Sequence, residues 1–163
     1  MLPAGGAFLV CVGLGLLGGI AFSGAALVNF NVFYAGVAAG VIALCFAGRL
    51  STGTPTRLQI AALAGAVLLE LLLLAVQGRT LPRGTEEHVR WLWISGIVGV
   101  HFLPMAISFG PRFAVLGAAC ILNAALGLLA ASVPYEVFGL VDGALKLGFG
   151  AWSLAGGVGG KRS

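Results

Sequence analysis

The sequence predicts an all-α fold, a polytopic membrane protein built as a bundle of six transmembrane helices. The 163 residues are 60% hydrophobic and only 9% charged, whereas about 25% of the residues in soluble domains are charged. Six apolar runs follow one another, most of them close to the ~20 residues that a helix needs to cross a bilayer. A soluble chain of this length could not bury so much apolar surface. We therefore expect lipid to surround a single transmembrane domain over residues 1–163.

Boundaries between the predicted spans follow from polar residues and from length. The spans cover about residues 4–28, 32–48, 58–77, 91–109, 113–133 and 137–158. One helix over residues 4–48 would be ~67 Å long at 1.5 Å per residue, about twice the hydrocarbon thickness. This stretch is therefore predicted to be a tight hairpin with Asn29 and Asn31 at its turn. Residues 78–88 are the longest polar segment and are expected to form a surface loop.

The basic residues at the span ends predict an orientation. Six spans place both termini on one side, and basic residues favour the cytoplasmic side. The side of the termini carries Arg49, Arg57, Arg112, Lys161 and Arg162, and the other side carries Arg79, Arg83 and Arg90. Five against three favours cytoplasmic termini. Because Ala, Gly, Leu and Val dominate the composition, we expect a bacterial protein of the inner membrane.

Several classes of function are disfavoured by the motifs. The three cysteines lie in apolar runs without CxxC spacing, which argues against a disulfide framework or a zinc site. His88 and His101 are 13 residues apart on one segment, too far apart to ligate one haem. No P-loop, dinucleotide fingerprint, HExxH or GxSxG motif occurs. We therefore expect no cofactor, no metal and no nucleic-acid partner. The expected partners are membrane lipid and either a small-molecule or proton cargo or an apolar substrate.

Two patterns bear on the arrangement of the spans. Three spans before the long polar segment and three after it could form a 3+3 inverted repeat, as in many transporters. Glycine pairs with the small-xxx-small spacing, which lets helices approach closely, are Gly15/Gly19, Gly36/Gly40 and Gly139/Gly143. They predict tight helix packing and are also compatible with a homo-oligomer.

The fourth span carries an ionisable residue near its middle. His101 lies at that position, and Pro104 follows three residues later. A charge at membrane depth is costly, so an ionisable residue there is a functional hypothesis by default. The proline has no N–H and frees the carbonyl of Val100, next to the histidine.

Polar residues form stripes at helical spacing on several spans. Residues 11 and 7 apart share one face of a helix. The third span has Gln59, Glu70 and Gln77 at these intervals, and the fourth has Arg90, His101 and Ser108. The predicted site consists of polar residues near the span midpoints: Glu70, His101, Asn123, Asp142 and Lys146.

A shared depth would let these side chains meet inside the bundle. An unpaired charge at the bilayer centre costs ~3 kcal/mol on insertion scales, and pairing offsets that cost. Asp142 and Lys146, four residues apart, can pair within their own helix. Glu70 has no local partner, so it must carry a proton or pair with a base on another helix, either His101 or Lys146. Asn123 is interpreted as an interhelical hydrogen-bonding residue. We expect Glu70, His101, Asp142 and Lys146 to converge on one interior region.

Three functional interpretations remain open. The first is a small transporter or proton-linked permeation protein, oligomeric, in which Glu70 or His101 changes charge, because histidine side chains titrate near neutral pH. The second is an intramembrane enzyme acting on a lipid, isoprenoid or other apolar substrate. In that case Glu70, His101 and Asp142 would act as general acid and base, and Lys146 would keep Asp142 ionised. The third is a packing or scaffold subunit without a site.

One segment carries a family resemblance. The run Gly99-Val-His-Phe-Leu-Pro104, followed by the Gly110-Pro111-Arg112 turn, resembles a set of small multi-pass bacterial membrane proteins of uncharacterised function that carry a Gly-x-His-Phe-x-Pro segment. The resemblance implies a shared fold and a matching role for His101 and Pro104, and it implies no activity.

Overall fold

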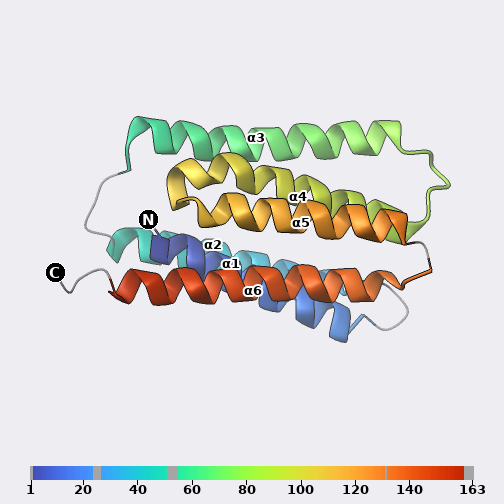
Figure 1. Cartoon of the computed structure of the whole chain (residues 1–163), viewed down its shortest axis with the longest axis horizontal. Helices are drawn as coiled ribbons and strands as arrows, with labels where there is room; N and C mark the ends of the chain where they lie inside the picture. The colour runs from blue at the N-terminus through green and yellow to red at the C-terminus, as the bar shows by residue number, and fades with distance from the viewer. Residues whose placement is uncertain (1, 24–26, 51–54, 131, 160–163) are drawn as a thin grey trace. The chain divides into compact units, whose positions relative to one another are not determined.

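The computed structural model describes residues 2–23, 27–50, 55–130 and 132–159. These residues form helices and no strand, as predicted (Figure 1). The helices are α1 (Leu2–Ala21), α2 (Phe30–Leu50), α3 (Arg57–Thr80), α4 (Glu87–Phe109), α5 (Arg112–Leu129) and α6 (Tyr135–Gly159). The all-α fold class is therefore confirmed.

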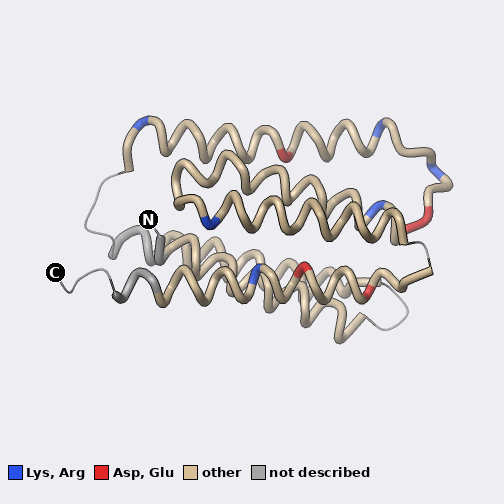
Figure 2. Tube along the Cα trace, viewed as in Figure 1, with Lys and Arg blue, Asp and Glu red and all other residues tan. Residues whose placement is uncertain are grey.

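Length and composition identify most of these helices as membrane spans. Among the described residues, α1, α3, α4, α5 and α6 are long and apolar enough to cross a bilayer. The apolar part of α2, Phe30–Phe46, is shorter, so α2 as a sixth span stays a prediction. Many of the charged residues lie at helix ends and in loops (Figure 2). The chain is a helical membrane protein.

The helices group into two compact units. The first unit contains residues 1–55 and 139–163, which include α1, α2 and most of α6. The second unit contains residues 56–138, which include α3, α4, α5 and the first turn of α6. This grouping does not follow the boundary between the first three and the last three predicted spans. The inverted repeat and the single domain stay predictions, and each unit is described by itself.

Asn29 shapes the hairpin of the first unit. Helix α1 ends at Ala21, seven residues before the predicted limit of residue 28, although the sequence remains largely apolar up to that limit. The Asn29 amide Nδ2 donates to the carbonyl oxygen of Phe22 at 3.0 Å, and its backbone N–H donates to the carbonyl of Gly19 at 2.7 Å. Its Oδ1 accepts from the backbone N–H of Asn31 at 3.2 Å. Asn29 therefore closes α1 and also starts α2, the position where asparagine is a favoured N-cap.

Glycines bring the helices of the first unit into backbone contact. A Cβ atom on Gly15 would lie 2.8 Å from the Cα of Gly36, so only glycine fits where α1 crosses α2. A Cβ atom on Gly13 would lie 2.8 Å from the backbone nitrogen of Leu147 and 2.9 Å from the carbonyl oxygen of Gly143, on α6. The glycines thus allow the predicted close packing between helices of one chain. A homo-oligomer stays a prediction.

In the second unit, local hydrogen bonds fix the start of α3. The Thr56 hydroxyl accepts from the Gln59 backbone N–H at 3.2 Å, and the Gln59 Oε1 accepts from the Thr56 N–H at 3.0 Å. This is a capping box, which satisfies two otherwise unpaired N–H groups. The Thr-x-x-Gln signature is readable in the sequence but was not among the predicted features.

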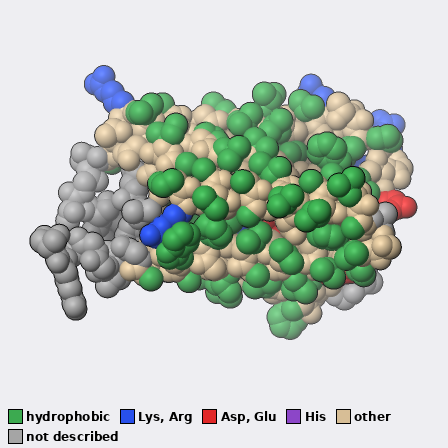
Figure 3. Space-filling view, in the orientation of Figure 1, with side chains coloured by type: hydrophobic (Ala, Val, Ile, Leu, Met, Phe, Trp, Pro, Cys, Tyr) green, Lys and Arg blue, Asp and Glu red, His purple; other side chains and the backbone are tan. Residues whose placement is uncertain are grey.

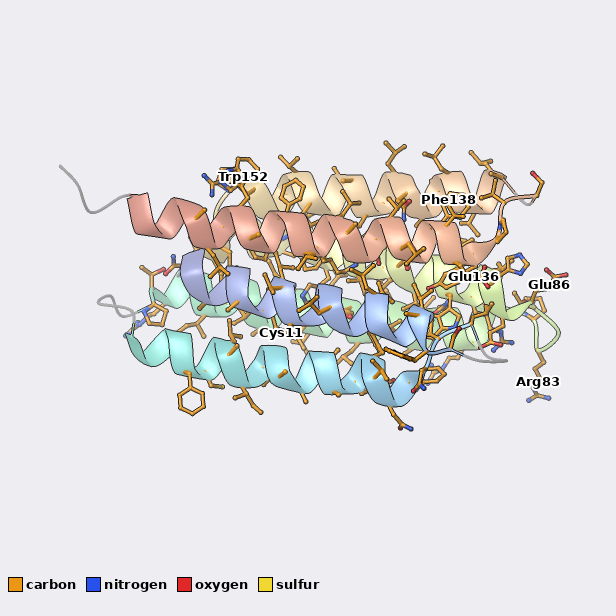
Figure 4. All side chains as sticks on the ribbon, turned by 90° about the horizontal axis from the view of Figure 1, so that it is seen from below. Cys11, Arg83, Glu86, Glu136, Phe138 and Trp152 are labelled. Atoms are coloured by element: carbon orange, nitrogen blue, oxygen red, sulfur yellow. The ribbon has the colours of Figure 1, made fainter. Side chains whose placement is uncertain are left out.

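Arg90 organises the loop between α3 and α4. Its guanidinium donates to the carbonyl oxygens of Thr85 at 3.2 Å, Pro82 at 3.0 Å and Arg83 at 3.2 Å. Arg83 and Glu86 point away from the helices at this end (Figure 4). Arg90, predicted above as a positive charge at a span end and as a member of the polar stripe, therefore also holds the loop against the first turns of α4.

Helices α4 and α5 pack around a glycine crossing and an aromatic cluster. A Cβ atom on Gly117 would lie 2.6 Å from the carbonyl oxygen of Gly99. Phe113 packs against Phe102 with ring centroids 6.0 Å apart and against Phe109 with centroids 4.9 Å apart. Interiors this closely packed deform little. Helix α4 therefore presents its polar stripe to α3 from a fixed position.

Candidate functional site

The polar stripes of α3 and α4 face each other and define an α3–α4 polar seam. Three polar contacts between described residues join the two helices, which run antiparallel. In order along the seam, the Ser108 hydroxyl donates to the Gln59 carbonyl at 2.8 Å, Glu70 Oε2 lies 2.7 Å from His101 Nδ1, and Gln77 Nε2 donates to the Arg90 carbonyl at 3.0 Å. Four of the six stripe side chains form these contacts, whereas the side chains of Gln59 and Arg90 bond within the capping box and to the loop. The outer contacts use a backbone carbonyl, and only the central one joins two side chains.

The geometry of the α-helix explains why Glu70 reaches His101. The two outer contacts set a register in which Ile97 stands level with Glu70, and His101 lies four residues, about 6 Å, further along α4. A Cα–Cβ bond in a helix tilts toward the helix N-terminus. Because the helices are antiparallel, Glu70 leans toward His101 and His101 leans back toward Glu70. Two long side chains thus close an offset that shorter ones could not.

The Glu70–His101 contact has the distance of a charged pair. At 2.7 Å it is as short as a charge-assisted hydrogen bond. The imidazole Nδ1 nevertheless has no hydrogen bond of suitable geometry among the described residues, so the contact is a close approach that becomes an ion pair when the imidazole is protonated. The His101 side chain is 10% exposed and the Glu70 side chain is 27% exposed.

The surroundings of His101 keep the imidazole in place. Its ring meets the Phe102 ring edge-on, with centroids 5.7 Å apart. Gly99, two residues before it, lies at the α5 crossing. Helix α4 continues through Pro104, which cannot donate to the carbonyl of Val100. The histidine is therefore held on a rigid stretch of helix beside a carbonyl that lacks its helical partner.

Asp142 and Lys146 pair within α6, as their spacing predicted. Lys146 Nζ lies 2.5 Å from Asp142 Oδ2, and the two side chains are 3% and 4% exposed. The other carboxylate oxygen, Asp142 Oδ1, is buried without a hydrogen-bond partner among the described residues. This pair belongs to the first unit, whereas Glu70 and His101 belong to the second. The predicted convergence of all four residues therefore stays a prediction.

Asn123 makes the interhelical hydrogen bond expected of it. Its Nδ2 donates to the carbonyl oxygen of Phe138 at 2.9 Å, joining α5 to the first turn of α6 (Figure 4 labels Phe138). The acceptor is a backbone group, which a sequence pattern of side chains does not reveal. The contact supports the packing interpretation of this residue.

Gln77 and Ser108 supply the two other side chains of the seam, and the predicted site left them out. Both belong to the stripes recognised from spacing, and that spacing was the signal that could have included them. Their contacts with Arg90 and Gln59 fix the register of α3 on α4. They therefore position Glu70 without contacting it in the described hydrogen bonds.

Removing the outer contacts should loosen α3 in measurable steps. We expect Gln77→Leu and Ser108→Ala each to lower the free energy of unfolding in detergent by about 0.6 kcal/mol, the mean for membrane hydrogen bonds. The sites lie about 27 Å apart along α3, so the double variant should show the sum of both losses. Chemical denaturation followed by circular dichroism measures these values. No loss in either single variant would mean that the contacts do not hold the helix.

Comparisons with known proteins identify a family. No curated protein and no solved structure matches the chain significantly. The sequence model of one family matches residues 3–156, a range that includes the polar seam and the Asp142–Lys146 pair. The chain therefore belongs to the family of unknown function DUF6609.

Proposed function

We propose that the protein is a small membrane transporter or proton-linked permeation protein in which the Glu70–His101 pair takes up and releases a proton. The observation that carries the proposal is the 2.7 Å contact between these two side chains on two helices that are each long enough to cross a bilayer. An ionisable pair at such a position is costly, and its usual use is in proton or ion pathways.

The position of the pair along the helices supports the proposal. Glu70 is 13 residues from the first residue of α3 and 10 from the last, about 20 and 15 Å along the axis. The other charged residues of α3 are Arg57 and Arg79, near its two ends. One proton shared by the pair leaves either a neutral acid beside a neutral imidazole or a carboxylate beside an imidazolium. Gain or loss of a proton changes the net charge of the pair at mid-helix.

Two finer statements complete the proposal. We infer a role in proton handling for the Asp142–Lys146 pair, because both side chains are buried within a candidate span. We also place the protein in the bacterial inner membrane with cytoplasmic termini. This orientation follows from the basic residues at the span ends. Among these residues, Lys161 and Arg162 lie outside the described part of the chain.

Proton flux into proteoliposomes tests the proposal. Purified protein is reconstituted into vesicles that contain a pH-sensitive dye, and an inward proton gradient is imposed. We expect wild-type vesicles to acidify faster than protein-free vesicles, and His101→Gln vesicles to acidify at the protein-free rate, because glutamine does not titrate.

The chain offers a matched control in its second histidine. His88 lies near the loop, pairs with Glu86 at 3.2 Å and is 38% exposed. The variant His88→Gln should keep the wild-type flux. Equal flux in wild-type and protein-free vesicles would contradict the proposal, and so would unchanged flux in the His101→Gln variant.

A further inference from the structure

Glu70 lies on the least buried of the candidate spans. Only 6% of α3's candidate span is buried, against 33–56% for the other candidate spans. In α3, Ala66 is the only residue classed as buried. Hydrophobic side chains are exposed along α3 (Figure 3). Its two basic residues, Arg57 and Arg79, lie near its ends. Within its own unit, α3 therefore leaves most of its surface uncovered.

Within the Glu70–His101 pair, the carboxylate is the more exposed of the two groups. The Glu70 side chain is 27% exposed, whereas the His101 side chain is 10% exposed. Its neighbours on α3, Val67 and Leu71, are exposed at 43% and 58% and are apolar. A molecule dissolved in the hydrocarbon can thus approach the carboxylate over an apolar surface, while the imidazole lies behind it.

We propose that Glu70 binds lipophilic organic cations that arrive through the lipid and displace the imidazolium of His101 as its partner. This inference rests on the proposed function and names the cargo class of the same site. Charge complementarity carries it: a carboxylate in hydrocarbon attracts a cation strongly because little water screens the charge. An apolar cation can also pack against the exposed side chains of Val67 and Leu71, whereas a hydrated inorganic ion cannot.

The exchange balances in charge and in protons. Before binding, the Glu70 carboxylate faces the His101 imidazolium, and the pair is neutral. The incoming cation becomes the partner of the carboxylate, the imidazole loses its proton, and that proton passes to water. The site therefore stays neutral, and one proton leaves for each cation that binds. Reversal of the exchange returns the proton and releases the cation.

Binding of tetraphenylphosphonium to the purified full-length protein tests this exchange. We expect the apparent Kd to rise by up to about tenfold for each pH unit of acidification, because one proton competes for the site. A weakly buffered sample should release one proton per bound cation. Tetraphenylborate, an anion of the same size, should not compete with the bound cation.

Substitutions locate the site. We expect Glu70→Gln to weaken tetraphenylphosphonium binding by at least about tenfold, the loss of one charged contact. The matched control is Glu136→Gln, which removes an exposed carboxylate in the first turn of α6. Melting curves followed by circular dichroism show whether each variant is folded.

The outcomes separate this inference from the proposed function. Wild-type binding that does not depend on pH, or equal binding of cation and anion, overturns the cation site even if Glu70→Gln cannot be purified. Proton flux that persists without tetraphenylphosphonium binding overturns the cation site and leaves the proposed function standing. Absence of both flux and binding overturns the two together. Binding that is pH-dependent, selective for the cation and lost in Glu70→Gln supports the inference.

Discussion

Vesicles that contain Glu70→Gln are expected to acidify no faster than protein-free vesicles, although the variant folds. Glutamine keeps the size of the side chain and has groups that can hydrogen-bond to His101, so the seam should hold. The amide cannot take up or release a proton, and the pair then has no acid to exchange with the imidazole. Dye-based proton flux gives the rate, and a melting curve in detergent shows that the fold is kept.

A carboxylate outside the seam serves as the reference for this variant. Glu136→Gln removes the same charge from an exposed position at the start of α6 and should keep the wild-type flux. If Glu70→Gln folds and transports protons at the wild-type rate, Glu70 is a packing residue. The scaffold interpretation would then be the better one.

Asp142→Ala should destabilise the protein by about 3–5 kcal/mol, more than the double variant Asp142→Ala/Lys146→Met. The single change leaves the Lys146 ammonium buried and without its carboxylate, and breaking a buried pair in this way is strongly destabilising. The double change replaces both charges with apolar groups, which is often close to neutral. Thermal unfolding in detergent compares the two variants with wild type.

The destabilisation expected for Asp142→Ala depends on the burial of the pair, so an exposed carboxylate on the same helix serves as the control. Asp142 and Lys146 are each 2% exposed, whereas Glu136 on the same helix is exposed. Glu136→Ala should therefore change the melting temperature little. Equal destabilisation by the single and double variants would show that the pair adds nothing beyond the two separate side chains.

The helices could be predicted from the sequence because hydropathy reports lipid exposure over whole turns. The end of α1 could not, since Phe22 and Val28 are as apolar as the helix, and the turn depends on hydrogen bonds from Asn29 to backbone groups. Hydropathy does not register such bonds. The exact boundary is thus a matter of capping, which a run of apolar residues conceals.

The sequence predicted which helix face carries each candidate site residue, but it did not predict which base pairs with Glu70. Spacing placed Glu70 on one face of a helix, and His101 and Lys146 were both available as its base. Periodicity gives the angle of a residue around its own helix and says nothing about which helix stands opposite. The choice of His101 required the register of α3 on α4, which two side chain-to-backbone hydrogen bonds determine.

In each outer contact of the seam, one residue contributes a backbone carbonyl and the other a side chain, so mutation of the two residues should affect that hydrogen bond differently. Gln59 and Arg90 contribute carbonyl oxygens there, and every amino acid supplies the same group. A substitution at either position therefore preserves that acceptor, provided the helix forms. The partners Gln77 and Ser108 contribute side-chain donors, which most substitutions remove. Mutational damage to the register should thus fall on Gln77 and Ser108, whereas a substitution at Gln59 or Arg90 acts through the capping box or the loop contacts of its own side chain.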